Sequence, residues 1–159
     1  MGDFSHLSKN FQAKMVDLSE KVPSLRKASV WGTVSISSNC IEKLNDKSIN
    51  EIICTARLAG IQAAKQTHNI VPLCHQIFLD DIDIEIFLNK ENLLFEIMTT
   101  VKTHSSTGSE MECMIGSTVV AVTIYDMIKA VNPEAILGPF KLVNKQGGKS
   151  GYWTRPEGI

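Results

Sequence analysis

The segment Asp80–Val101, with the sequence DDIDIEIFLNKENLLFEIMTTV, is the strongest indication of how this chain folds. Apolar and acidic side chains alternate along Asp80–Leu88, and the alternation resumes from Phe95 after the polar residues Asn89–Asn92. Alternation with a period of two is typical of a strand with one buried face, and a polar turn between two such runs indicates a hairpin. We therefore expect an antiparallel hairpin here.

Helix and strand patterns flank this hairpin on both sides. The predicted elements, in chain order, are a strand at Ser29–Ser37, a short helix capped by Ser38, a helix at Lys47–Gln66, the hairpin, a long helix at Ser109–Val131 and a short strand at Phe140–Val143. This order predicts an α+β fold, a ferredoxin-like split βαβ sandwich with an antiparallel sheet and helices packed on one face. The helix at Lys47–Gln66 carries a stripe of small residues, which favours close packing against a sheet or another subunit.

The chain has 159 residues, of which 43% are hydrophobic, and no repeat or linker divides it. We expect a single domain over residues 1–159, with an irregular N-terminal arm at 1–27 and a flexible C-terminal loop, rich in Gly and Lys, at 145–159. No apolar run approaches the length of a membrane span, and a net charge of −1 gives no general attraction to nucleic acid or to membranes. Four cysteines without a C-x-x-C pair indicate reduced thiols, so we expect a cytoplasmic protein without a zinc site.

The predicted long helix carries charged residues only near its two ends. Glu110 and Glu112 stand at its beginning, where Glu112 has the spacing of a capping box with Ser109, and Asp126 and Lys129 stand near its close. Its large apolar residues recur at helical spacing and are expected to face the core: Met111, Met114, Ile115, Val119, Val122, Tyr125 and Ile128. A carboxylate and an ammonium beside this stripe are expected to be incompletely solvated and so suited to acid/base chemistry. The alternative is a solvated ion pair worth a few tenths of a kcal/mol.

Two other segments have a composition suited to a binding site. Pro72 fixes the backbone just before His75, which favours an imidazole aimed into a cleft, although a loop histidine without a function is the alternative. The segment 145–151 combines glycines with Lys145 and Lys149, which suits phosphate binding, and the alternative is a flexible tail. Basic residues elsewhere, in a chain of negative net charge, favour a small polyanionic ligand: Arg26, Arg57, Lys65 and Lys129.

Several segments together resemble one known family over about residues 15–151. They are Met15-Val16-Asp17, LAGIQAAK at 58–65, PLCH at 72–75, Thr107-Gly108 with Glu110-Met111-Glu112, TIYDMIKAV at 123–131 and GGKSG at 147–151. With these segments in this order, the chain resembles the MoaC family of molybdenum cofactor biosynthesis. The resemblance implies a ferredoxin-like subunit in a homohexamer, a trimer of dimers with active sites at the dimer interfaces.

The resemblance also implies a lyase reaction. The substrate is (8S)-3′,8-cyclo-7,8-dihydroguanosine 5′-triphosphate, and the products are cyclic pyranopterin monophosphate and pyrophosphate. No cofactor is required, although Mg²⁺ can accompany the triphosphate. The alternative is a non-catalytic, nucleotide-binding scaffold protein with the same fold.

The motif positions assign roles to individual residues by resemblance. Asp126 takes the place of the family's general acid/base, and Lys129 that of the essential lysine beside it. The other matched positions bind the substrate: Leu73, Cys74 and His75, then Glu110, Met111 and Glu112, with Lys65, Lys145 and Lys149 at basic positions for the triphosphate. None of these positions is a metal ligand.

The chain departs from the family's pattern at two places. A Lys-Gly-Asp turn commonly leads into the small-residue helix and supplies a catalytic lysine, whereas here Ile49, Asn50 and Glu51 stand at these positions. Lys47 stands two positions earlier and either replaces that lysine through a local shift or leaves the role unfilled. The second departure removes a lysine before the long helix, where Ser106 stands.

Overall fold

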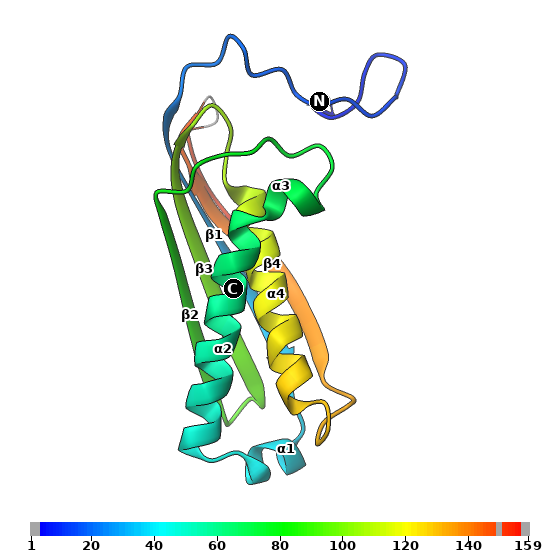
Figure 1. Cartoon of the computed structure of the whole chain (residues 1–159), viewed down its shortest axis with the longest axis vertical. Helices are drawn as coiled ribbons and strands as arrows, with labels where there is room; N and C mark the ends of the chain where they lie inside the picture. The colour runs from blue at the N-terminus through cyan, green and yellow to red at the C-terminus, as the bar shows by residue number, and fades with distance from the viewer. Residues whose placement is uncertain (1–3, 149–150, 157–159) are drawn as a thin grey trace.

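The structure is a computed structural model that describes residues 4–148 and 151–156. Its elements are β1 (Ser24–Ser35), α1 (Ser38–Lys43), α2 (Asp46–Lys65), α3 (Thr67–Ile70), β2 (Asp81–Asn89), β3 (Leu94–Ser105), α4 (Glu110–Ile128), β4 (Ile136–Gln146) and β5 (Tyr152–Thr154). The strands form one antiparallel sheet in the order β2-β3-β1-β4-β5. Helices α2 and α4 lie side by side over one face of this sheet (Figure 1). This arrangement confirms the predicted ferredoxin-like α+β fold, to which β5 adds an edge strand.

The predicted hairpin is confirmed as the pair β2 and β3. Ile86 lies opposite Ile97, and Ile84 lies opposite Thr99. These four side chains are all buried beneath the helices. The alternate side chains face the uncovered side of the sheet, where the Lys102 ammonium lies 2.8 Å from the Asp81 carboxylate.

Helix α2 packs closely on β2 through small residues, as its sequence predicts, and also on α4, which its sequence does not predict. A Cβ atom on Gly60 would lie 2.8 Å from Cδ1 of Ile84 and 3.1 Å from the carbonyl oxygen of Gly116, and it would also collide with Val120. A glycine is therefore required where the two helices and β2 meet.

The prediction for the buried face of α4 was largely wrong. Small and polar residues form most of the buried face: Glu112, Cys113, Gly116, Ser117, Val120, Ala121, Ile124 and Ile128. Two of them are hydrogen-bonded to the sheet, since Cys113 Sγ lies 3.2 Å from the Ala28 carbonyl and Ser117 Oγ donates to Thr99 over 2.8 Å. Small side chains let α4 approach both the sheet and α2. Several large apolar residues, such as Met111 and Val122, are left on the outer side of the helix layer.

Helix α4 also corrects the expectation that no segment approaches membrane-spanning length. It is long and apolar enough to cross a membrane, judged by length and composition alone. In this structure it packs against α2, β1, β3 and β4 instead, which is the environment of a core helix.

Several predicted boundaries were also wrong. Strand β1 begins at Ser24, inside the stretch predicted as an irregular arm, because its first residues pair with the end of β3. Ser37, rather than Ser38, caps α1 through a bond from the Cys40 amide. The predicted flexible C-terminal loop contains the end of β4 and all of β5, which pair through Lys145 and Trp153.

Candidate functional site

The first turn of α4 lies beside the end of β4, and an ion pair joins them. The Lys145 ammonium lies 3.2 Å from Oε1 of Glu110, and about a third of each side chain is exposed. Arg26 and Lys27 of β1 line the same small hollow as Lys145 and Glu110. Two cationic side chains, those of Arg26 and Lys145, therefore lie near one carboxylate at this end of the sheet.

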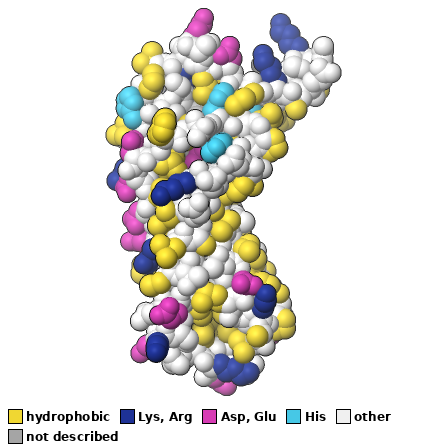
Figure 2. Space-filling view, viewed as in Figure 1, with side chains coloured by type: hydrophobic (Ala, Val, Ile, Leu, Met, Phe, Trp, Pro, Cys, Tyr) yellow, Lys and Arg dark blue, Asp and Glu magenta, His cyan; other side chains and the backbone are white. Residues whose placement is uncertain are grey.

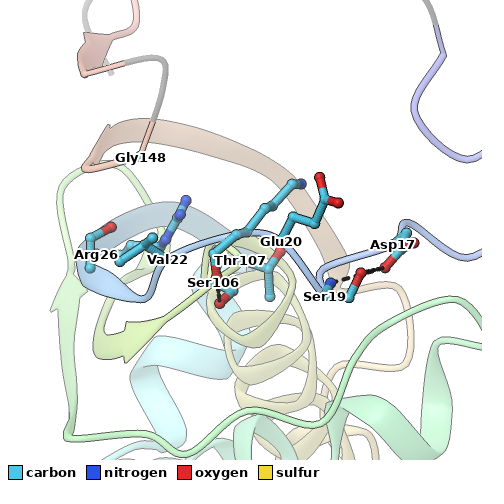
Figure 3. A pocket seen from close by; sticks show the side chains of 10 residues that line it. Asp17, Ser19, Glu20, Val22, Arg26, Ser106, Thr107 and Gly148 are labelled. Carbon is cyan, nitrogen blue, oxygen red and sulfur yellow. Dashed lines mark hydrogen bonds between the residues drawn. The ribbon is translucent and has the colours of Figure 1, made fainter.

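A cavity of about 1050 Å³ adjoins this hollow (Figure 3). The arm residues from Asp17 to Ser24 form one wall, and Ser106 and Thr107 of the loop between β3 and α4 form another. Arg26 lines both the cavity and the hollow, and its Nε donates to the Ser105 carbonyl over 2.8 Å. Gly148 has a positive φ of 69°, and a side chain there would collide with the Arg26 guanidinium. Lys21 also lines the cavity.

Glu112 is a buried acid in the first turn of α4. Its side chain is only 4% exposed, and burial raises its pKa to about 7, with a smaller contribution from Glu110 in the same direction. The predicted capping box is wrong, because in the described structure Ser109 makes no side-chain capping bond and donates instead to the Val101 carbonyl over 3.2 Å. A carboxyl group with a pKa of about 7 exchanges its proton near neutral pH, which is the property that a general acid or base requires.

Cys74 lies close enough to Glu112 for the charge of the Glu112 carboxylate to affect the pKa of the Cys74 thiol. Burial raises the pKa of the Cys74 thiol, and the Glu112 carboxylate raises it further. The structure thus places Cys74 near the first turn of α4. His75 is half-buried, and its Nε2 lies 2.6 Å from the carbonyl oxygen of Val16 in the arm.

Asp126 and Lys129 lie at the opposite end of α4. Their side chains form an ion pair of 2.6 Å, with exposed fractions of 67% for Asp126 and 57% for Lys129. The hydrogen bond from Lys129 to Asp126 raises the pKa of this lysine. The expected incomplete solvation of the pair was therefore wrong for a single chain. The pair is separated from Glu112 by about 20 Å along the helix, at about 1.5 Å per residue.

Of the other basic residues that the sequence points to, one lies near the beginning of α4, one has a structural role and one lies outside the described residues. Lys65 is exposed at the last residue of α2, which runs antiparallel to α4 and ends beside its beginning (Figure 1). Arg57 has a structural role instead, because its Nε donates to the Ile84 carbonyl over 2.9 Å. Lys149 falls outside the described residues.

Residues 15–148 match the family model described as the MoaC family. The chain belongs to the MoaC family. It is 38% identical to the cyclic pyranopterin monophosphate synthase of Geobacillus sp. (strain WCH70), covering 98% of this chain and 93% of the relative. It is 40% identical to the synthase of the same name from Bacillus licheniformis and 38% identical to that from Bacillus subtilis (strain 168), over 98% of this chain and 95% and 94% of the relatives.

The departure of this MoaC-family chain at Ile49–Glu51 lies within a helix. Because α2 begins at Asp46, these residues lie within its first two turns rather than in a turn before the helix. Lys47 is exposed in the first turn of α2, at the same end of the molecule as Asp126 and Lys129 (Figure 1). The position of Lys47 therefore agrees with a role beside this pair.

Two residues of this MoaC-family site escaped assignment from the sequence. The sequence indicates Arg26 only as one of several basic residues that favour a polyanionic ligand, and it gives Lys21 no role. The signal that could have placed both residues is that they follow the Met15–Asp17 motif closely in the sequence. In the described part of the chain, no group of three or more His, Cys, Asp and Glu side chains is arranged to hold a metal ion.

Proposed function

We propose that this protein is a cyclic pyranopterin monophosphate synthase. It converts (8S)-3′,8-cyclo-7,8-dihydroguanosine 5′-triphosphate to cyclic pyranopterin monophosphate and releases pyrophosphate, as a phosphorus–oxygen lyase of molybdenum cofactor biosynthesis. The observation that carries the proposal is the gathering of basic side chains from the arm, β1 and β4 around the cavity and the hollow that adjoins it, at the end of α4 where Glu112 is buried. The names of the relatives agree with it.

The basic side chains suit the triphosphate. Arg26 and Lys21 line the cavity, and Lys145 stands in the adjoining hollow. An arginine binds phosphate oxygens with two parallel hydrogen bonds, and lysines add charge without a fixed geometry. Together they neutralise the pyrophosphate that leaves when the cyclic phosphate forms. We extend this role to Lys65 and Lys149 by resemblance.

The acidic and imidazole groups suit the ring chemistry. Opening the purine-derived ring and closing the pyran ring requires repeated proton transfers. Glu112 has a pKa of about 7, and Cys74 and His75 stand in the segment beside it. We propose Asp126 as the principal general acid/base and Lys129 as its partner, with Leu73, Glu110 and Met111 contributing to substrate binding.

The site requires a second copy of the chain. The Asp126–Lys129 pair lies about 20 Å from Glu112, which is too far for both to contact one small substrate within a subunit. The outer side of the helix layer between them exposes apolar side chains, including Leu58 and Val122 (Figure 2). Packing this face on its copy across a two-fold axis perpendicular to α4 runs the two α4 helices antiparallel and joins opposite ends. We propose such dimers, assembled as a trimer of dimers in a homohexamer.

The remaining properties follow from this proposal. The four cysteines are free thiols, two of them buried, which suits the reducing cytoplasm that we propose. No protein-bound cofactor is proposed, and any Mg²⁺ that accompanies the triphosphate belongs to the substrate. The partners are the nucleotide-derived substrate and other copies of the chain, rather than nucleic acid or a membrane.

The direct test supplies the purified protein with the cyclised GTP precursor and measures pyranopterin and pyrophosphate together. We expect both products in equal amounts. Binding of the precursor without turnover would contradict the proposal and favour the non-catalytic alternative. Lys47→Ala tests the missing lysine, since an unchanged rate would show that Lys47 does not replace it.

A further inference from the structure

The contact between His75 and the arm determines which ring nitrogen of His75 carries a proton. Nε2 of His75 lies 2.6 Å from the backbone carbonyl oxygen of Val16. A carbonyl oxygen only accepts hydrogen bonds, so Nε2 must be the donor. Neutral His75 is therefore held as the Nε2–H tautomer, and its Nδ1 carries the free lone pair.

The arm segment that supplies this carbonyl is itself fixed by local contacts. Both the backbone amide and the hydroxyl of Ser19 donate to Asp17 Oδ1, over 2.9 and 2.7 Å. Ser106 Oγ donates to the Lys21 carbonyl over 2.7 Å, which anchors the arm to the loop before α4. The pKa of Asp17 is lowered mainly by the Ser19 hydrogen bonds, with smaller contributions from Lys14 and His75.

The fixed nitrogen matters because of where His75 stands. Its ring bonds to Val16, the residue before Asp17, and Asp17 lines the cavity in which we propose that the substrate binds. His75 also follows Cys74, whose thiol pKa is raised by the Glu112 carboxylate. A histidine whose one nitrogen donates to a fixed acceptor presents its other nitrogen in a defined direction, an arrangement that orients catalytic and metal-bound imidazoles in general.

We infer that the N-terminal arm is a positioning element, in which the Val16 carbonyl holds His75 so that Nδ1 exchanges the proton with the substrate. This inference rests on the proposed function. Nδ1 accepts a proton from the bound substrate as the neutral base and returns it from the imidazolium, whose Nε2–H bond to Val16 stays in place throughout. No other reactant is required, because the proton only moves between Nδ1 and the substrate.

The first experiment measures the tautomer in the wild-type protein. Spectra of ¹⁵N-histidine-labelled protein, recorded where His75 is neutral and assigned with His75→Gln, should show a protonated Nε2 and an unprotonated Nδ1. The opposite pattern, or an averaged signal from both tautomers, would overturn the inference. This measurement does not depend on turnover, so a protein that shows the expected tautomer but forms no product would contradict only the proposed function.

The second experiment separates anchoring of the arm from proton transfer. His75→Gln places an amide N–H near the position of Nε2, and His75→Asn places its amide near the position of Nδ1. We expect Gln to keep residues 15–19 protected from proteolysis while kcat falls by about 100-fold or more. We expect Asn to expose the arm and to lose kcat as well.

A matched control and a clear contrary result complete this test. His104→Gln, which alters an exposed histidine of β3 outside the proposed site, should leave both the tautomer of His75 and kcat close to wild type. If His75→Gln retained wild-type kcat with the arm in place, His75 would serve only as an anchor, and its assignment as the proton-exchanging group would be wrong.

Discussion

The Lys145 ammonium lies 3.2 Å from the Glu110 carboxylate and joins the end of β4 to the first turn of α4. The carboxylate holds this lysine at the hollow that Arg26 also lines. A partly exposed ion pair contributes only about 0–1 kcal/mol to stability, so we attribute to this pair a role in substrate binding as well. It places a positive charge at the position where we propose that the triphosphate binds.

Lys145→Met should weaken substrate binding more than it changes stability. We expect KM to rise by about tenfold or more, because one charge-assisted phosphate contact is lost. The free energy of unfolding should change by less than about 1 kcal/mol. Steady-state kinetics and urea unfolding measure the two effects. Lys102→Met, which breaks the Lys102–Asp81 pair on the uncovered face of the sheet, is the control and should leave KM unchanged.

Asp126→Asn and Lys129→Ala should each abolish product formation without dissociating the oligomer. Their side chains are more than half exposed in the single chain, so their loss removes little packing. Product analysis and size-exclusion chromatography give the two readouts. Asp81→Asn alters an exposed carboxylate that is also paired with a lysine and should remain active. A nearly wild-type rate in either Asp126→Asn or Lys129→Ala would show that the catalytic pair is wrongly assigned.

Glu112→Gln should change how stability depends on pH. Burial raises the pKa of Glu112 in the folded chain from its ordinary value of 4.5 to about 7, so between these values the folded chain binds more protons than the unfolded chain. Its contribution is fully present below the unfolded pKa and is lost as the pH rises through 7, by at most about 3 kcal/mol. Urea unfolding of wild type and variant, at equal protein concentration, should therefore favour the variant more at about pH 8 than at about pH 4.5. An equal difference at both pH values would contradict the raised pKa.

Gly60→Ala should destabilise the fold although alanine is the better helix former. The added Cβ would collide with Val120 and lie 2.8 Å from Ile84, so we expect a loss of about 1–3 kcal/mol from overpacking against a propensity gain of about 1 kcal/mol. Thermal or urea unfolding measures the net loss. Gln62→Ala on the exposed side of α2 should stay within about 0.5 kcal/mol. A more stable Gly60→Ala variant would show that α2 and α4 have room to separate.

The sheet was predictable from the sequence because its signal is local. In β2 and β3 every second side chain is buried, so alternation alone reveals both strands and the turn between them. The small residues of α2 likewise predicted close packing on the sheet, which Gly60 makes against Ile84, although they did not predict its contact with α4. In both cases the spacing of residue types along the sequence directly matches which side chains are buried.

The orientation of α4 was not predictable in the same way. The large apolar residues of α4 predicted the face that points to the core, but only small side chains allow the close approach of α4 to α2 and the sheet. Cys113 and Ser117 also form hydrogen bonds to residues of strands that are distant in sequence. The places of Arg26 and Lys21 in the site and the contact of Val16 with His75 also depend on tertiary packing of an arm without periodic sequence. Local patterns pointed to His75, Lys145 and the Asp126–Lys129 pair only as candidates with structural alternatives, and the motif resemblance supplied the remaining site residues.

The most direct measurement of the central claim, a site shared between two copies of the chain, mixes two inactive variants. Glu112→Gln damages the beginning of α4, and Asp126→Asn damages its end. After unfolding and refolding together, half of the dimers are mixed, and each mixed dimer has one undamaged site of two, which predicts about a quarter of wild-type activity. If the mixture is no more active than the two variants refolded separately, the two ends of α4 do not serve one site across an interface, and the account is wrong.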